Sequence, residues 1–393
     1  MIGMLVGAVK RSPAVPAMAG LVVLCTVFSI MEPSFFTAGN LANLTAQGAQ
    51  VAVIAMGLIF VLLLGEIDLS AGFASGVCAG VLAVTLVRYD FPWYLAVLVS
   101  ILTGTAIGLL LGFLVAKIGI PSFVVTLAAF LAFQGVALLL LEQGKNVSVR
   151  DPIILAIANR NLYPWLGWAL GAVGVVAFAV VQFLSTARRR AKGVKTERWQ
   201  ITTAKVVGLA LAVGAAVAVL NEERSINVMI SSLKGVPIVV PIVVVLLVIW
   251  TFVLRRTAYG RHIYAVGGNN EAARRAGINV DRIRISAFVI CSSMAAIGGI
   301  IAASRANSVD PNTGGSNVLL YAVGAAVIGG TSLFGGKGRA IDAVVGGLVV
   351  AVIENGMSLL NYGPGIKYVV TGMVLLLAAG VDALSRKRSD AGR

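Results

Sequence analysis

Long runs of apolar residues, separated by short polar segments, constrain this sequence more than any other feature. An α-helix that crosses the hydrocarbon core of a bilayer needs about 20 consecutive, mostly apolar residues. Runs that approach this length predict helical spans at residues 14–31, 49–65, 70–88, 93–116, 121–141, 165–184, 204–220, 237–254, 285–303, 318–333, 340–361 and 366–384. Hydrophobic residues make up 59% of the 393 residues and charged residues only 12%. Such a chain has too few polar groups to cover a water-soluble fold, so the sequence predicts an all-α, polytopic transmembrane bundle.

The net charge of +15 reflects orientation in a membrane more than affinity for nucleic acid. If the first span begins in the cytoplasm, most of the 31 basic residues fall in cytoplasmic segments, as the positive-inside rule requires. We therefore expect both termini in the cytoplasm and no nucleic-acid partner. The chain is expected to form one transmembrane domain over residues 1–393, with a basic cytoplasmic loop at 185–204 and a second cytoplasmic loop at 255–284.

The residue types that carry most enzyme chemistry are scarce in this sequence. It has one histidine and three cysteines that lie far apart, so neither a Cys–His metal site nor a Ser–His–Asp set can be built. The glycine-rich stretch before Lys337 is not a phosphate-binding loop, because Gly338 stands where that motif needs Ser or Thr. We predict a chain that is not an enzyme, holds no metal and has no nucleotide-hydrolysing motif of its own.

The cytoplasmic loop at 255–284 carries a pattern that orientation alone does not require. Gly267–Gly268 predict a turn, Asn269–Asn270 a helix N-cap, and Gly277 a C-cap around a short run of helix-forming residues. Glu271 near the start and Arg274–Arg275 near the end complement the helix dipole. A short capped helix on the inner face is expected to be a docking surface for a soluble partner.

Two carboxylates lie between apolar runs, in the segment Gly65-Glu66-Ile67-Asp68-Leu69-Ser70. Carboxylates at membrane depth are costly and usually have a role. Three interpretations remain open: Asp68 caps the next helix, the pair relays protons or cations, or the segment bends the chain beside a substrate path. A related break at residues 327–339 suggests a weak internal duplication, as in transporters built from repeats.

Other polar side chains interrupt later runs, among them Ser122, Thr126 and Asn355. Such residues commonly form hydrogen bonds to neighbouring helices. Together with Glu66, Asp68 and Ser70, they are the candidates for lining or gating a translocation path.

Several of these segments together resemble the permease subunits of bacterial ABC importers for monosaccharides, the ribose, xylose, arabinose and galactose group. The matching segments are Gly65 to Gly72, Ile120 to Leu127, the loop from Thr257 to Arg282, Val327 to Gly336, and Asn355-Gly356-Met357. Glu66 and the extra apolar runs at about 142–235 are most similar to the xylose branch. The resemblance thus implies ten core helices plus about two extra.

The resemblance also implies partners and a mechanism. Two permease copies form a pore in the bacterial inner membrane, two ATPase subunits bind ATP and magnesium beneath it, and a periplasmic protein delivers the sugar. The chain itself would hold no cofactor and would contact membrane lipid. The ATPase-coupling residues implied are Gly268, Asn270, Glu271, Ala272, Ala273, Arg274, Gly277 and Ile278.

The function expected is ATP-driven import of a monosaccharide, D-xylose above others, by alternating access. One alternative is an ion-coupled secondary sugar carrier with Glu66 or Asp68 as proton sites. Another is an intramembrane enzyme that uses these two carboxylates as acid and base.

Overall fold

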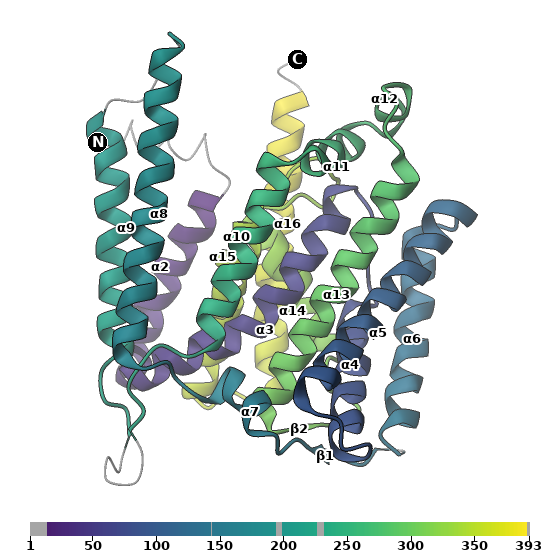
Figure 1. Cartoon of the computed structure of the whole chain (residues 1–393), viewed down its shortest axis with the longest axis horizontal. Coiled ribbons are helices and arrows are strands. Elements are labelled where there is room, and N and C mark those ends of the chain that lie inside the picture. Colours follow the sequence, from purple (N-terminus) through teal and green to yellow (C-terminus); the bar gives the residue numbers. More distant parts are fainter. Residues whose placement is uncertain (1–13, 143, 194–198, 226–231, 391–393) are drawn as a thin grey trace.

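The structure is a computed structural model that describes residues 14–142, 144–193, 199–225 and 232–390. It is an all-α, polytopic bundle (Figure 1). The helices are α2 (Ala14–Met31), α3 (Ala38–Leu63), α4 (Ala71–Val87), α5 (Trp93–Phe113), α6 (Ser122–Leu140), α7 (Pro152–Asn159), α8 (Pro164–Ala191), α9 (Trp199–Leu220), α10 (Val239–Arg256), α11 (Ala258–Gly268), α12 (Asn270–Arg275), α13 (Val280–Ala306), α14 (Ser316–Gly329), α15 (Ala340–Leu359) and α16 (Pro364–Asp390). A 3-10 turn η1 (Pro33–Phe36) precedes α3, and a π-helical turn η2 (Leu114–Ile118) extends α5.

Two long helices form the centre of the bundle. Most of α3 is buried, and it packs against α13, α15 and α14, while α13 also packs against α5 and α4. Glycines allow α5 to approach α13 closely: a Cβ atom at Gly104 would lie 2.6 Å from the carbonyl oxygen of Ser292, and one at Gly108 would lie 2.5 Å from that of Phe288. Small residues at helix crossings are the usual means of close packing in a membrane, and these glycines act in this way.

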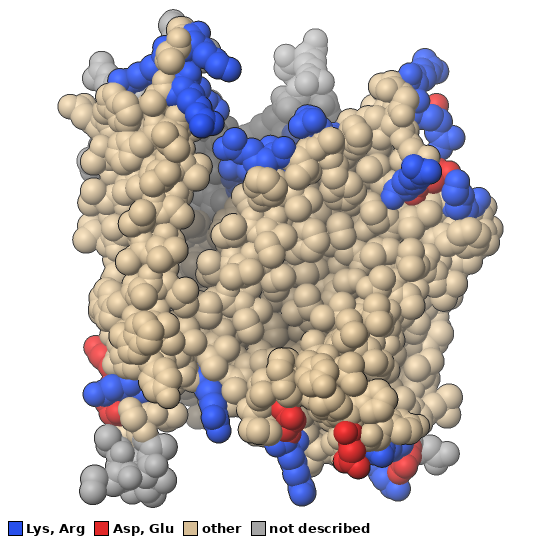
Figure 2. Space-filling view, viewed as in Figure 1, with Lys and Arg blue, Asp and Glu red and all other residues tan. Residues whose placement is uncertain are grey.

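The bundle has two distinct ends. We call them the α12 end, where α11 and α12 project, and the ribbon end, where β1 (Val147–Ser148) pairs with β2 (Ser308–Val309) beside α7 (Figure 1). The first described turn of α2 and the last turn of α16 both lie at the α12 end. Lysine and arginine predominate at the α12 end on the face shown, whereas acidic and basic residues mix at the ribbon end (Figure 2).

Every apolar run predicted from the sequence coincides with a helix. Eight helices of the described part, α3, α5 with η2, α6, α8, α9, α10, α13 and α15, are long and apolar enough to cross a membrane. Four shorter apolar helices accompany them, at residues 16–31, 71–87, 317–329 and 364–377.

Three predicted boundaries are wrong. Helix α3 begins at Ala38 rather than near residue 49, because Thr37 caps it and its polar first turns still form helix. The basic loop expected at 185–204 is mostly helical, since α8 continues to Ala191 and α9 begins at Trp199; residues 194–198 lie outside the described part. Gly267 and Gly268 form the last residues of α11 rather than a turn.

Candidate functional site

The short helix α12 lies exposed at the α12 end of the bundle and is capped at both ends. The Asn269 side chain accepts a hydrogen bond from the Ala272 N–H at 2.9 Å, which satisfies one of the donors that a helix start leaves unpaired. At the other end, Gly277 has φ +83°, a conformation that glycine adopts without strain. The capped helix predicted from the sequence is therefore confirmed, with bounds Asn270–Arg275.

Most of the predicted coupling residues lie on the surface. The exposed members are Gly268, Glu271, Ala272, Arg274 and Gly277, and the half-buried ones are Asn270 and Ile278. Ala273 is the buried member, and it holds α12 to the rest of the chain. A continuous exposed segment of this kind leaves main-chain and charged groups available to another protein.

Helix α11 contacts both chain breaks of the bundle. A Cβ atom on Gly267 would lie 1.7 Å from the carbonyl oxygen of Leu63 and 3.0 Å from the nitrogen of Gly336, so only glycine fits there. The Gly336 N–H in turn donates to the Leu63 carbonyl at 2.8 Å. The first break (64–70) and the second break (330–339) therefore meet at the end of α11.

A side chain adds a second link between α11 and the second break. The Tyr264 hydroxyl donates to the carbonyl of Gly338 at 2.6 Å. Burial, and then the nearby Asp342 carboxylate, raise the pKa of Tyr264, so the hydroxyl keeps the proton that it donates. Movement of α11 must therefore displace the second break or break this bond.

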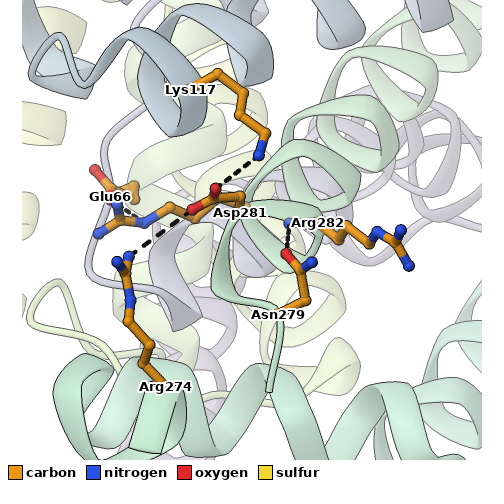
Figure 3. A network of polar contacts seen from close by, with 7 residues as sticks. Glu66, Lys117, Arg274, Asn279, Asp281 and Arg282 are labelled. Carbon is orange, nitrogen blue, oxygen red and sulfur yellow. Dashed lines mark hydrogen bonds and ion pairs between the residues drawn. The ribbon is translucent and has the colours of Figure 1, made fainter. Parts of the chain in front are cut away.

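The first turn of α13 connects α12 to two other segments (Figure 3). Asp281 forms an ion pair with Lys117 of η2 at 2.9 Å and a longer one with Arg274 of α12 at 3.9 Å. Asn279 caps α13 by accepting the Arg282 N–H at 3.0 Å. Exposed pairs of this kind contribute little to stability, and here they bring side chains of α12 and η2 to the first turn of α13.

One turn further along α13, Arg284 pairs with Glu66 in the first break. The Arg284 Nε atom lies 3.1 Å from the Glu66 Oε1 atom, and both side chains are mostly buried. A buried charge that loses its partner costs more than the pair contributes when intact. Glu66 is thus paired with a cation in the first break.

We predict that this pair is energetically coupled. Each single replacement, Glu66→Gln or Arg284→Gln, should lower the thermal stability of the purified chain. The double replacement should lower it by less than the sum of the two single effects. The interaction energy expected from a double-mutant cycle is about 0.5–3 kcal/mol. Strictly additive changes in melting temperature among the three variants would show that the two residues are independent.

The remaining polar residues predicted around the first break lie together there. Asp68 Oδ1 accepts hydrogen bonds from the Ser70 N–H at 2.9 Å and its hydroxyl at 2.6 Å, which stabilises the turn into α4. Ser122 accepts the Ile67 N–H at 3.3 Å, and the Thr126 hydroxyl donates to the Ile67 carbonyl at 3.2 Å. These bonds pair backbone groups of Ile67 and Ser70 in the chain break, whereas the buried Asp68 Oδ2 atom has no hydrogen-bond partner among the described residues. Asp68 therefore stabilises the turn before α4, whereas the N-cap of α4 is Ser70, whose side chain makes no capping bond.

Asn355 lies elsewhere, near the ribbon end. Its carboxamide pairs reciprocally with that of Asn40: each nitrogen donates to the other residue's oxygen, at 2.8 and 2.9 Å. The structure therefore separates the predicted path residues into one group at the first break and one amide pair near the opposite end.

Three contributing residues escaped the sequence analysis: Arg284, Lys117 and Asp281. The ion pairs Arg284–Glu66 and Lys117–Asp281 join residues far apart in the sequence, and no local pattern indicates such pairs. The glycine doublet was noticed, but the close contact of Gly267 with Leu63 depends on how α11 packs. Within the described residues, no group of His, Cys, Asp and Glu side chains is arranged to hold a metal.

Comparison with known proteins identifies the family. Residues 40–158 and 153–379 match a family described as the permease component of branched-chain amino acid transport systems. The chain belongs to this permease family. It is 36% identical over 376 residues to the xylose transport system permease protein XylH of Escherichia coli strain K12, covering 94% of this chain and 92% of that protein.

Other relatives agree in length and kind. The xylose transport system permease protein XylH of Haemophilus influenzae is 33% identical over 369 residues, 94% of this chain and 95% of its own. The ribose import permease protein RbsC of Escherichia coli strain K12 is 31% identical over 366 residues, which cover 93% of this chain and 92% of that protein. No solved structure matches the chain.

These relatives confirm the resemblance to ABC monosaccharide permeases of the xylose type. Together with the apolar helices, they identify a multi-pass protein of the inner membrane. The relatives are transport components rather than enzymes, which argues against an intramembrane enzyme.

Proposed function

We propose that this chain is the permease subunit of an ATP-driven importer that moves a monosaccharide, with D-xylose as the expected sugar, by alternating access. The observation that carries the proposal is α12: it is capped and exposed, and it is connected through α11 and α13 to both chain breaks. The xylose permeases that share more than nine-tenths of their length with this chain support the choice of sugar.

The proposed orientation places the α12 end in the cytoplasm. The basic residues that gather at this end support it, because positively charged segments are retained on the cytoplasmic side. Both termini would then be cytoplasmic, with ten core helices and the hairpin α8–α9 as the two extra ones. The ribbon end would face the periplasm, where a sugar-binding protein would dock.

Energy would enter from two ATPase subunits beneath a dimer of permeases. The exposed residues of α12 and its flanks would contact the ATPase subunit, and ATP and magnesium would bind there rather than to this chain. Movement of α12 would pass to α13 through Asp281 and to the breaks through Gly267 and Tyr264.

The proposed gates are at the two ends of α3. The first break, with Glu66, Asp68, Ser70, Ser122 and Thr126, would form the cytoplasmic gate. The Asn40–Asn355 pair would belong to the periplasmic side. The sugar is neutral, so its passage does not need a buried counter-ion, in agreement with the pairing of Glu66 with Arg284.

We predict that transport by the purified chain requires its partners. In proteoliposomes that contain the chain, the ATPase subunits and the sugar-binding protein, uptake should depend on ATP, and a panel of pentoses and hexoses should show D-xylose as the best substrate. Liposomes that hold the chain alone, under an imposed pH gradient, are the control. Sugar accumulation in that control would favour an ion-coupled carrier instead.

A further inference from the structure

The hairpin of α8 and α9 is joined to the bundle mainly near the ribbon end. There Val217 and Leu220 of α9 pack with Val236 and with Val240 of α10. Towards the α12 end the packing stops: Val244 and Val248, one and two turns beyond Val240 on α10, are 50% and 61% exposed. A hollow between the hairpin and α10 is visible over this length (Figure 2).

Basic residues occupy both sides of the hollow at its α12 end. Arg188 and Arg189 lie exposed in the last turn of α8, and Arg255 and Arg256 lie exposed in the last turn of α10. The hairpin side is anchored, because Arg190 stacks over Trp199, with its guanidinium carbon 4.8 Å from the ring centroid.

We propose that this hollow holds an anionic phospholipid of the cytoplasmic leaflet, with its phosphate between the arginines of α8 and α10 and its acyl chains against α10. The orientation rests on the proposed function. Basic pockets between transmembrane helices on the cytoplasmic side bind anionic headgroups, and arginine binds phosphate with two parallel hydrogen bonds.

The length of the exposed α10 wall fits a lipid. From Arg256 to Val244 the α10 axis rises about 18 Å, and one leaflet of the hydrocarbon core is roughly 15 Å deep. A soluble ATPase subunit reaches the arginines but not the apolar wall that continues to Val244. A second copy of this chain would bring like charges together, which disfavours it as the occupant.

The test measures lipid retention by the purified chain in nanodiscs that contain equal amounts of phosphatidylglycerol and phosphatidylcholine, without ATPase or sugar. Wild-type protein should retain phosphatidylglycerol preferentially when transferred to detergent and analysed by native mass spectrometry. The triple variant Arg188→Gln/Arg189→Gln/Arg256→Gln should retain roughly tenfold less. Inorganic phosphate added as a competitor should not displace the lipid, because phosphate lacks acyl chains.

A matched control removes three exposed bases from other segments of the α12 end: Arg275→Gln/Arg282→Gln/Lys337→Gln, which should retain lipid as wild type does. A further variant, Val244→Trp/Val248→Trp, keeps every charge and fills the hollow, so it should also lose the lipid. Size-exclusion chromatography checks that each variant is folded. Equal retention of phosphatidylglycerol by all proteins, no preference for it in wild type, or displacement by phosphate alone would overturn the proposal. Because the measurement involves no transport, its failure leaves the proposed function unaffected.

Discussion

Replacing Gly267 by alanine should reduce sugar uptake more than tenfold while the protein still inserts into the membrane. A methyl group at this position would overlap the carbonyl oxygen of Leu63, 1.7 Å away, and crowd the Gly336 nitrogen. Both neighbours are backbone atoms that cannot rotate aside, so α11 must move away from the two breaks. Overpacking of this kind costs about 1–3 kcal/mol, and the shift would also strain the Tyr264–Gly338 hydrogen bond.

Gly268 provides the matched control for Gly267. It is the next residue of the same helix, and a Cβ atom there would have no neighbour within 4 Å. Since Gly268 also belongs to the proposed docking segment, the two variants are compared first by the melting temperature of the chain alone. Gly267→Ala should lower it, and Gly268→Ala should leave it unchanged or raise it slightly, because alanine favours a helix. Equal effects of the two replacements would show that the contact with Leu63 is unimportant.

The variant Ala273→Pro should abolish ATP-driven uptake. The Ala273 N–H donates to the Asn269 carbonyl at 3.0 Å, the first hydrogen bond that closes α12. Proline removes this donor, and its ring clashes with the preceding turn at a cost of about 3 kcal/mol, which a six-residue helix cannot offset. The exposed segment would lose the shape that a partner recognises, although the membrane helices would be unaffected.

Ala258→Pro is the control for this experiment. Ala258 is the first residue of α11 in the same loop, and Thr257 before it is extended, with ψ 163°. Proline is tolerated at the first helical position after an extended residue. This variant should transport normally, whereas Ala273→Pro should reach the membrane, fail to stimulate the ATPase subunits and take up no sugar. Normal uptake by Ala273→Pro would exclude α12 as the coupling element.

The parts of the structure that the sequence predicted correctly depend on local physical chemistry. A run of apolar residues needs no distant partner to form a helix in a membrane, because its backbone hydrogen bonds close within the segment. Likewise, Asn269 and Gly277 cap the two ends of α12 through hydrogen bonds to residues only a few positions away. Both features could therefore be predicted without knowing the fold.

The sequence-based predictions fail where the structure depends on contacts between residues that are distant in the chain. The turn expected at Gly267–Gly268 is instead the end of a helix, and the close approach of the Leu63 carbonyl accounts for the glycine at position 267. The first break was recognised by its carboxylates, but the charge that neutralises Glu66 comes from Arg284, more than 200 residues away. Single-sequence patterns do not encode such pairs.

The helix α3 is held very differently at its two ends. Near the ribbon end, the carboxamides of Asn40 and Asn355 form two reciprocal hydrogen bonds, and these side chains tie α3 to α15. At the other end, the Leu63 carbonyl contacts the backbone of Gly267 and Gly336, which have no side chains to interlock with α3. A rod of 26 residues, about 39 Å long, is thus tied by side chains at one end and by close backbone contacts at the other. A rotation of α3 about Asn40 would move the far end of the helix most, and it would displace the proposed gate beside α11.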